Sequence, residues 1–518
     1  MIPLQTSPVN AVEFHNITKT FGSIVANHNV SLEVRKGEIL SLLGENGSGK
    51  TTLMNMLAGI YFPEHGHIVV NGEEVSIRSP RDAFDLKIGM IHQHFKLVDV
   101  FTAAENIVLG LKEKGKFDRK AIAKQIREIS TRYGFDLDPD RKIYDMAVSE
   151  KQTVEIIKVL YRGADVLILD EPTAVLTPQE TEKLFQVLRN MKADGKSIVI
   201  ITHKLNEVMA ISDRVAVLRK GEYIATVETK DTNPQALTDM MVGRSVTLNI
   251  DRPVPKDPQE RLVVDGLTCS DTEGVKVLDN VSFTVNGGEI FGIAGIAGSG
   301  QRELCEAIAG LYPVGSGRIH YNSRQDPGHT EDLVGKSPKA IRDLGVSLAF
   351  VPEDRLGMGL VGSMGMIGNM MLKTYGKGRH MFLETRPSRD LAREIMEKLE
   401  VVTPSIDTPV RRLSGGNVQK VLVGREIASE PSVLMMAYPV RGLDINSSYM
   451  IYRMLNEQKE KGVAVIYVGE DLDVLLQLCD RILVLCGGKV SGVVDGRSVT
   501  KEEVGLLMTH TGEVSGRG

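Results

Sequence analysis

Apolar and polar residues follow the same order twice along the chain. Residues 11–44 and residues 261–295 alternate valine, isoleucine, leucine and phenylalanine with polar residues, and their turns contain glycine. This period of two predicts β-strands. Each stretch is followed by a glycine-rich loop, a helical pattern, a Ser-Pro turn, a charged helical region and two apolar strands. Because strands alternate with helices in both copies, the pattern predicts two α/β domains of one plan.

The spacing between equivalent positions locates the domain boundaries. Equivalent residues are 251 positions apart at the glycine-rich loop (44 and 295) and 267 apart at a later apolar strand (170 and 437). The increase predicts small insertions in the second copy near 322–335. The segment between the copies contains three prolines and many charges, which is typical of a stiff surface linker. We therefore expect a first domain over 1–248, a linker over 249–261 and a second domain over 262–518.

Composition places the chain among ordinary globular proteins. Its 518 residues, of which 42% are hydrophobic and 25% charged, are enough for two domains with buried cores. The net charge of −5 argues against a protein that binds nucleic acid through a basic surface. The first ten residues lack a signal-peptide pattern, and no apolar run reaches the roughly 18–20 residues of a membrane-spanning helix. We therefore expect a cytosolic chain, unless a partner holds it elsewhere.

Two further features have ordinary interpretations. The four cysteines (Cys269, Cys305, Cys479 and Cys486) form no CxxC pair, so we expect buried free thiols rather than a disulfide framework or a zinc site. Residues 117–134 place three isoleucines on one helical face with basic residues opposite. This pattern fits either a nucleic-acid patch or a solvated helix over a core, and the neighbouring acidic residues favour the solvated helix.

The first glycine-rich loop has the residues that phosphate binding requires. Residues 44–51 read GENGSGKT, after an apolar strand and before a helix. Glycines let backbone N–H groups converge on phosphate oxygens, and the helix directs its positive end at them. Lys50 can bridge the β- and γ-phosphates, and the Thr51 hydroxyl can ligate Mg²⁺. The loop residues that we expect to contact the nucleotide are Gly44, Asn46, Gly47, Ser48, Gly49, Lys50, Thr51 and Thr52.

Charged residues end two later apolar strands of the first copy. Residues 166–172 read VLILDEP, in which Asp170 can hold Mg²⁺ through water and Glu171 can polarise an attacking water as a general base. The other interpretation, an ordinary surface strand end, is disfavoured beside the glycine-rich loop. His203 ends the strand IVIITHK and is either a packing residue or a γ-phosphate contact. The loop and the two acids favour the phosphate contact.

With these motifs the chain resembles the ATP-binding-cassette ATPases, and specifically a fused tandem cassette of a bacterial importer, over nearly its whole length. The resemblance implies two P-loop domains in tandem, each with a RecA-like core, an antiparallel β subdomain and a helical subdomain, that meet head to tail. It implies that Phe21 stacks on adenine, although a core phenylalanine is the other interpretation. It also implies that Gln93 reaches the metal and the γ-phosphate.

The same resemblance assigns two motifs of the second copy. Residues 413–420, LSGGNVQK, match the signature motif, which caps the γ-phosphate of the opposite cassette from a helix N-terminus. Asp444 in RGLD matches the aspartate that links the two sites across the dimer. The signature residues expected at the nucleotide are Ser414, Gly415, Gly416 and Asn417.

Both copies depart from the family pattern. The second copy keeps loop residues that can surround a phosphate, namely Gly295, Gly298, Ser299 and Gly300. Its replacements are Gln301 for the lysine, Arg302 for the metal-binding hydroxyl, Ala437 and Tyr438 for the paired acids, Glu470 for the histidine and Glu353 for the glutamine. The first copy has Ala147 for the signature serine, Ser149 for a glycine and Thr177 for the linking aspartate.

These departures fall into one of the two sites that head-to-tail pairing would create. Loop 44–51 paired with signature 413–417 gives a site with every part present. Loop 295–302 paired with residues 146–150 gives a site without the lysine, the hydroxyl, the acids, the histidine and the signature serine. We therefore expect one hydrolytic ATP site and one that binds nucleotide with little or no turnover.

Asymmetric fused cassettes of this kind resemble the ATPase subunits of importers for ribose-type sugars and for nucleosides. Segments 92–110, 171–180 and 231–244 look closer to the nucleoside group, with a ribose- or galactose-type monosaccharide importer as the alternative. The resemblance implies ATP and Mg²⁺, two transmembrane permease subunits docked near 93–110 and 353–372, and an extracytoplasmic substrate-binding protein. It implies a peripheral position at the cytoplasmic face of a bacterial membrane, with no nucleic acid.

Two rival classes remain at this stage. A soluble tandem-cassette protein, such as a translation factor, usually keeps two competent sites and a long basic linker, and neither is found here. A nucleotide-gated scaffold without turnover would not need Glu171 and His203. Both are therefore disfavoured relative to an importer ATPase.

Overall fold

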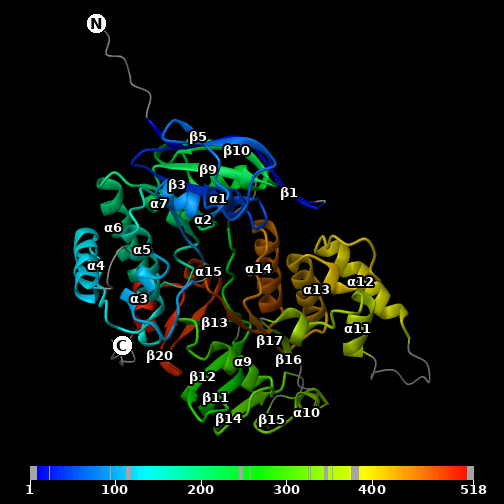
Figure 1. The fold of residues 1–518 in the computed structure, drawn as a ribbon. Helices are drawn as coiled ribbons and strands as arrows, with labels where there is room; N and C mark the ends of the chain where they lie inside the picture. The colour runs from blue at the N-terminus through cyan, green and yellow to red at the C-terminus, as the bar shows by residue number, and fades with distance from the viewer. Residues whose placement is uncertain are drawn as a thin grey trace. The chain divides into compact units, whose positions relative to one another are not determined.

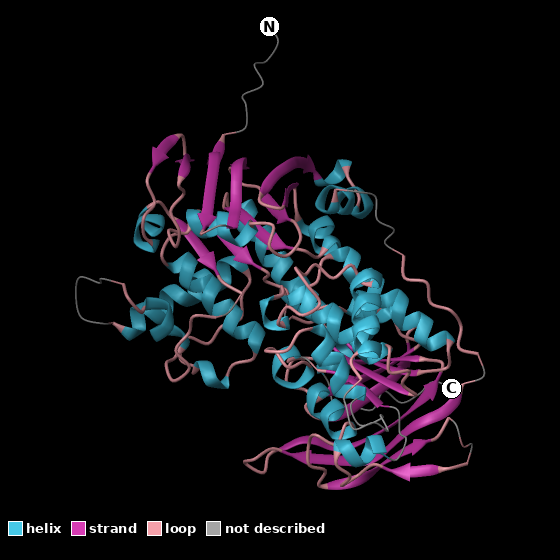
Figure 2. Ribbon diagram, turned by 90° about the vertical axis from the view of Figure 1, so that its right-hand side faces the viewer, coloured by secondary structure: helices cyan, strands magenta, loops and turns pink. Residues whose placement is uncertain are grey.

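The computed structural model contains two compact units, residues 1–247 and 248–518. Each unit combines helices with two β-sheets (Figures 1 and 2). The structure describes residues 9–22, 24–93, 95–111, 118–174, 176–243, 249–256, 258–324, 326, 328–343, 348–352, 354–374 and 384–509.

The first unit has an antiparallel sheet and a mostly parallel sheet. The antiparallel sheet has the order β2-β1-β4-β5, formed by β1 (Asn10–Phe21), β2 (Ile24–Arg35), β4 (His65–Val70) and β5 (Glu73–Val75). The other sheet has the order β10-β9-β3-β8-β7-β6, formed by β3 (Ile39–Leu43), β6 (Ile88–Ile91), β7 (Val166–Asp170), β8 (Ser197–Thr202), β9 (Arg214–Arg219) and β10 (Glu222–Glu228). All residues of β3, β7 and β8 are buried, which explains their continuous apolar sequences.

Helices of the first unit fall into two groups. Those around the sheets are α1 (Lys50–Leu57), α2 (Pro80–Asp85), α6 (Pro178–Ala193), α7 (Leu205–Ile211) and α8 (Pro234–Val242), with η2 (Thr229–Asp231). A separate helical part between β6 and β7 contains α3 (Ala103–Val108), α4 (Arg119–Tyr133), η1 (Ile143–Asp145) and α5 (Val148–Tyr161). Its helices contact one another around a core that includes Ile107, Ile126 and Ile157 (Figure 1).

The second unit repeats this plan. Its antiparallel sheet has the order β12-β11-β14-β15, formed by β11 (Gln259–Ser270), β12 (Lys276–Gly287), β14 (Ser316–Asn322) and β15 (Thr330–Asp332). Its larger sheet has the order β16-β17-β18-β13-β19-β20, formed by β13 (Ile290–Gly295), β16 (Leu348–Val351), β17 (Val433–Ala437), β18 (Ala464–Val468), β19 (Arg481–Cys486) and β20 (Lys489–Asp495). The duplication predicted from the sequence is therefore present in the strand order.

The helices of the second unit follow the same division. Those around the sheets are α9 (Gln301–Ile308), α10 (Pro338–Asp343), α14 (Ile445–Glu460), α15 (Leu472–Leu478) and α16 (Lys501–Thr509). The helical part contains η3 (Arg355–Gly359), α11 (Met366–Thr374), α12 (Arg386–Lys398), η4 (Val410–Arg412) and α13 (Gly415–Ile427). Helix α12 contacts both α11 and α13, and its Ile395 shares a core with Leu422 of α13 (Figure 1). The expected α/β fold with antiparallel and helical subdomains is confirmed in both units.

The segment 249–261 is not a free surface linker along its length. Arg252 donates to the carbonyl oxygens of Cys479 at 2.6 Å and Leu476 at 2.9 Å, and Asn456 donates to the carbonyl of Asp251 at 2.5 Å. The last residues of the segment are already part of β11. Its polar backbone therefore has partners in the second unit, which composition alone does not reveal.

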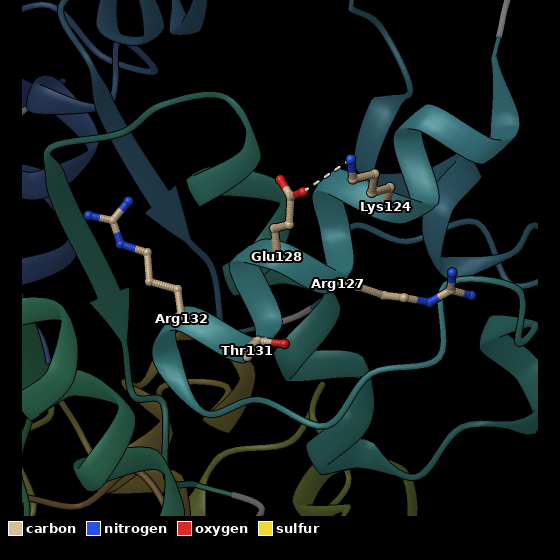
Figure 3. A pocket seen from close by; sticks show the side chains of 5 residues that line it. All are labelled: Lys124, Arg127, Glu128, Thr131 and Arg132. Atoms are coloured by element: carbon tan, nitrogen blue, oxygen red, sulfur yellow. Dashed lines mark ion pairs between the residues drawn. The ribbon is translucent and has the colours of Figure 1, made fainter.

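Helix α4 shows how the basic stretch of 117–134 is arranged. Asp118 caps its N-terminus, and Gly134 ends it with φ 87°. Ile122 and Ile126 are buried, whereas the basic side chains lie on the outer face beside a shallow pocket (Figure 3). Carboxylates neighbour several of them, as in the 3.9 Å pair between Lys124 and Glu128. The predicted helix is confirmed, and its basic side chains are interspersed with acids.

Cys269, Cys305 and Cys479 are buried free thiols, whereas Cys486 is only partly buried. Among the described residues, no helix is both long enough and apolar enough to cross a membrane.

Candidate nucleotide-binding site

The loop of residues 44–51 connects the buried strand β3 to α1. Gly47 and Gly49 have φ of 79° and 93°, a left-handed conformation that glycine adopts without strain. A Cβ at Gly49 would also overlap the carbonyl oxygen of Ala26 and lie 2.6 Å from the amide nitrogen of Asn27. Asn27 donates to the Gly49 carbonyl at 3.2 Å. Glycine is therefore required here both for the turn and for the close approach of β2.

Lys50 closes this loop on itself. Its buried ammonium donates to the carbonyl oxygens of Gly44 at 2.7 Å and Glu45 at 2.9 Å. Burial lowers the pKa of Lys50, and the carboxylates of Glu171 and Asp170 act in the opposite direction. Within the described residues, the buried hydroxyl of Ser48 has no hydrogen-bond partner in the protein. A phosphate oxygen would satisfy this hydroxyl, so the loop fits the anion that its sequence predicts.

Asp170 ends β7 beside the start of α1. The hydroxyl of Thr51 hydrogen-bonds its carboxylate. Burial and the neighbouring charge of Glu171 raise the pKa of Asp170, while Thr51 and Lys50 oppose the rise. A hydroxyl and a carboxylate oxygen are hard ligands of the type that Mg²⁺ prefers. These two residues therefore fit the metal that the resemblance implies.

Glu171 lies in contact with two other predicted site residues. Its Oε1 is 2.8 Å from Nδ1 of His203, and its Oε2 accepts from the side-chain amide of Gln93 at 3.4 Å. The three residues follow β7, β8 and β6, which are neighbouring parallel strands. Parallel strands place their carboxyl ends on one edge of the sheet, and this brings the three side chains together although they are far apart in sequence.

The surroundings of Glu171 favour its ionised form. Burial alone would raise the pKa of Glu171, but the hydrogen bond and charge of His203, with the charges of Lys50 and Lys204, bring it below its ordinary value. The backbone at Glu171 is left-handed, with φ 47°, and its N–H donates to the carbonyl of Ile201 at 2.9 Å.

Phe21 is an exposed ring with two neighbours that the sequence did not single out. Its side chain is 42% exposed. Tyr61 packs edge-on against it, with ring centroids 5.1 Å apart, and the Lys19 ammonium lies 5.3 Å from its centroid. The core interpretation of Phe21 is wrong, because a core ring would be buried. Tyr61 follows α1 by four residues, and only the fold brings it to the end of β1.

The second glycine-rich loop has the backbone conformation of the first loop but different side chains at the lysine and hydroxyl positions. Gly298 and Gly300 have φ of 86° and 98°, close to those of the first loop. Gln301 donates to the carbonyl of Ile296 at 3.1 Å, the position equivalent to Glu45. The amide therefore repeats one contact of Lys50 without its charge. Arg302 pairs with Glu306 at 2.7 Å in the same helix.

The acid positions of the second unit also have the backbone conformation of their equivalents in the first unit. Tyr438 has φ 52°, and its N–H donates to the carbonyl of Val468 at 2.9 Å, as Glu171 does to the equivalent Ile201. Ala437 ends β17 with no carboxylate, and Glu470 lies 3.6 Å from the guanidinium of Arg441. The sixth replaced position, Glu353, is outside the described residues.

The signature residues of the second unit form a capped helix start. Ser414 is the N-cap of α13, and its hydroxyl accepts from the backbone N–H of Asn417 at 3.4 Å and from its amide at 3.0 Å. Gly415 and Gly416 follow as the first residues of the helix. In the first unit the equivalent N-cap of α5 is Ala147, which has no hydroxyl.

The linking aspartate and its replacement have the same local role. Asp444 caps α14 by accepting from the N–H of Ser447 at 2.9 Å. Thr177 caps α6 by accepting from the N–H of Glu180 at 3.3 Å. Threonine and aspartate are both good N-caps, so this departure preserves the helix start while removing a charge.

Comparison with known proteins identifies the family of this chain. The model of the ABC transporter family matches residues 27–174 and 278–440. The guanosine import ATP-binding protein NupO of Bacillus subtilis (strain 168) is 44% identical, over 96% of this chain and 97% of that protein. The nucleoside import ATP-binding protein NupA of Lactococcus lactis subsp. cremoris (strain MG1363) is 43% identical, over the same shares of the two chains.

A more distant relative carries a sugar name. The ribose import ATP-binding protein RbsA 1 of Rubrobacter xylanophilus (strain DSM 9941 / JCM 11954 / NBRC 16129 / PRD-1) is 38% identical, over 97% of this chain and 99% of that protein. Both matched regions contain a glycine-rich loop and the strand that ends at the acid positions. The chain therefore belongs to the ABC transporter family, with two ATP-binding cassettes in tandem.

Proposed function

We propose that this chain is the ATP-hydrolysing subunit of an importer for nucleosides. The observation that carries the ATPase assignment is the contact between Glu171 and His203 at the mouth of a phosphate loop closed by Lys50. The nucleoside assignment is supported by the relatives at 44% and 43% identity, whose names specify guanosine and nucleoside import. A ribose- or galactose-type monosaccharide is the alternative substrate, supported by the ribose relative at 38% identity.

In the first-unit site, each residue has a distinct task. The loop N–H groups, the Ser48 hydroxyl and the Lys50 ammonium hold the phosphates of ATP. Glu171 accepts a proton from the attacking water, and the hydrogen bond to His203 orients its carboxylate. Thr51, Asp170 and Gln93 would hold Mg²⁺, which neutralises phosphate charge when it is bound. Phe21 supplies a face for adenine, and its exposure leaves that face accessible.

The second-unit loop binds nucleotide with little or no turnover in this proposal. Its glycines retain the backbone conformation that surrounds a phosphate. Gln301 supplies no positive charge, and Ala437 and Tyr438 supply neither a metal ligand nor a base. We further propose that the ATP-bound chain pairs its cassettes head to tail, so that Ser414, Gly415, Gly416 and Asn417 complete the site that contains Lys50.

Two transmembrane permease subunits and an extracytoplasmic substrate-binding protein are the proposed partners, with this chain peripheral at the cytoplasmic face. Exposed apolar side chains follow β6 in the first unit and β16 in the second, which supports docking there. They are Val98, Val100, Phe101, Leu356, Met358, Val361 and Met364. ATP-driven closure and hydrolysis-driven opening of the cassettes would then move the permeases.

Uptake by the assembled importer tests this function. The chain is co-purified with its membrane subunits and binding protein, reconstituted into vesicles, and supplied with ATP and labelled guanosine, adenosine, ribose or galactose. We expect ATP-dependent uptake of nucleosides, and none in a matched complex that carries Glu171→Gln. Uptake of sugars without nucleosides would contradict the substrate assignment. ATP binding without any hydrolysis would instead favour a nucleotide-gated scaffold.

A further inference from the structure

Arg355 of the second unit joins three segments that are separate in sequence. Its guanidinium donates through Nη1 to the carbonyl of Gly415 at 3.0 Å and through Nη2 to the carbonyl of Arg441. Arg355 begins η3, directly after β16, whereas Gly415 begins the signature helix α13. Arg441 lies three residues before Asp444, the N-cap of α14. One half-buried side chain therefore holds the signature and the loop before Asp444 against η3.

Other contacts make η3 and α13 a single body. Arg425 of α13 donates to the carbonyl of Gly359 at the end of η3, at 2.8 Å, so both ends of η3 are attached to that helix. The buried carboxylate of Glu426 accepts from Arg425 at 2.6 Å and from Lys373 of α11 at 2.9 Å. Because these partners are charged and largely desolvated, their bonds are stronger than neutral ones at a surface.

The contact between Arg355 and Gly415 is close-packed. A Cβ at position 415 would lie 3.1 Å from Nη1 of Arg355, tighter than ordinary van der Waals contact. A side chain at position 415 would therefore displace the guanidinium of Arg355 by a few tenths of an ångström. Leu356 and Met358, the residues of η3 next to this bridge, are 42% and 41% exposed. A partner can therefore reach η3 while Arg355 contacts the signature.

The first unit cannot make the same bridge. Two residues after Gln93 stands Phe95, at the position equivalent to Arg355, and a phenyl ring donates no hydrogen bond. The segment after β6 is attached instead to the middle of α5, where Glu155 accepts from the N–H of Lys96 at 2.6 Å. The bridge to a signature N-terminus is thus present in the unit whose signature retains its serine.

We propose that Arg355 is a positioning residue that couples η3 to the signature. When a membrane partner contacts η3, Arg355 transmits the displacement to Ser414, Gly415 and the loop before Asp444. This inference rests on the proposed function, because the signature matters only if it completes the ATP site that contains Lys50. Arg355 contacts backbone carbonyls and acts on hydrolysis through them.

Kinetics of the assembled importer test this role. Arg355→Ala is compared with Arg355→Lys and with Arg393→Ala, a matched control at an exposed arginine of α12. We expect Arg355→Ala to lower kcat on the order of tenfold, with the Kd for a fluorescent ATP analogue unchanged. Arg355→Lys should recover part of the rate, since an ammonium reaches one carbonyl but not both, and Arg393→Ala should match wild type. A kcat of Arg355→Ala within twofold of wild type would overturn the inference.

A double-mutant cycle separates coupling from a general defect. If Arg355 acts through the signature, the double variant Arg355→Ala with Ser414→Ala should lose little more kcat/KM than the more damaging single variant. Phe21 belongs to the other unit and its substitution should raise KM, so the losses in kcat/KM of Arg355→Ala and Phe21→Ala should multiply. Multiplied losses in both pairs would overturn the inference, and if Arg355→Ala does not fold, Arg355→Lys is used with the same criteria. A wild-type complex without ATPase activity would refute the proposed function itself.

Discussion

Replacing Glu171 with glutamine isolates the base from the rest of the site. The substitution keeps the side-chain volume but replaces one carboxylate oxygen with an amide nitrogen and removes the carboxylate charge near Lys50. Because the pKa of Glu171 lies below its ordinary value, the carboxylate is the form that the substitution removes at neutral pH. A general base contributes about 10²–10⁴ in rate, which corresponds to about 3–5 kcal/mol at 1.36 kcal/mol for each tenfold.

The substitution should slow ATP hydrolysis without weakening ATP binding. We expect kcat of Glu171→Gln to fall by about 10²–10⁴. The Kd for ATP should stay the same or decrease, because a negative charge near the phosphates has been removed. Phosphate release at saturating Mg-ATP measures the first, and equilibrium binding of labelled ATP measures the second. The matched control is Tyr438→Phe, at the residue with the equivalent left-handed backbone in the second unit.

The control should keep kcat within about twofold of wild type, if hydrolysis belongs to the first-unit site. A Glu171→Gln chain that retains more than about a tenth of the wild-type rate would refute Glu171 as the base. Equal losses in Glu171→Gln and Tyr438→Phe would refute the asymmetry of the two sites. Loss of ATP binding together with activity would instead show that Glu171 supports the structure of the loop.

Three further predictions follow from the same geometry. Lys50→Ala should abolish ATPase activity while Gln301→Ala leaves most of it, since only Lys50 carries a charge to the phosphates; equal losses in a phosphate-release assay would contradict this. Phe21→Ala should raise the KM for ATP by about 5- to 150-fold, the range for loss of about 1–3 kcal/mol of base stacking, with an unchanged melting temperature because the ring is exposed. An unchanged KM would remove Phe21 from the site. Asp170→Asn should abolish activity yet stabilise the first unit at pH 7, because the raised pKa of Asp170 means that folding disfavours its charged form. Each kcal/mol gained in the free energy of unfolding should raise Tm by about 2–4 °C. The cost of the charged form is fully present above the raised pKa and absent below the ordinary value of 3.8, so the gain in Tm should shrink as pH falls toward 3.8. A constant or negative difference in Tm across this range would contradict the assignment.

The order of elements and the loop conformations could be predicted from the sequence because they are local. Apolar runs specify the buried strands β3, β7 and β8, whose neighbours cover both faces. Gly49 and Gly300 have left-handed backbones that few other residues adopt without strain, so the glycine pattern identified both loops. The sequence also identified the lysine, the two acids and the histidine of the first loop's site, since each chemistry requires a particular side chain. It did not single out Lys19 or Lys204, whose charges lie near Phe21 and Glu171.

The sequence could not show which side chains meet. Glu171 lies 32 residues from His203 and 78 from Gln93, and their contact depends on the strand order β8-β7-β6. Arg355 reaches carbonyls that are 60 and 86 residues further along the chain. Such contacts depend on how far a side chain extends from a backbone already positioned by packing, and a linear pattern carries no information on that distance.

For the two copies, too, the sequence determined some features and the folded structure decided others. By itself, the sequence determined that this chain has two cassettes of one plan and that only the first has a lysine, two acids and a histidine. The tertiary structure decided that the second copy keeps the backbone of a site without its charges, with Tyr438 at the left-handed position and Gln301 bonded to the loop. It also decided that residues 251–253 are held by the second unit. Only the structure could decide these points, because a hydrogen bond to a backbone carbonyl depends on the folded geometry and can be made by chemically different side chains.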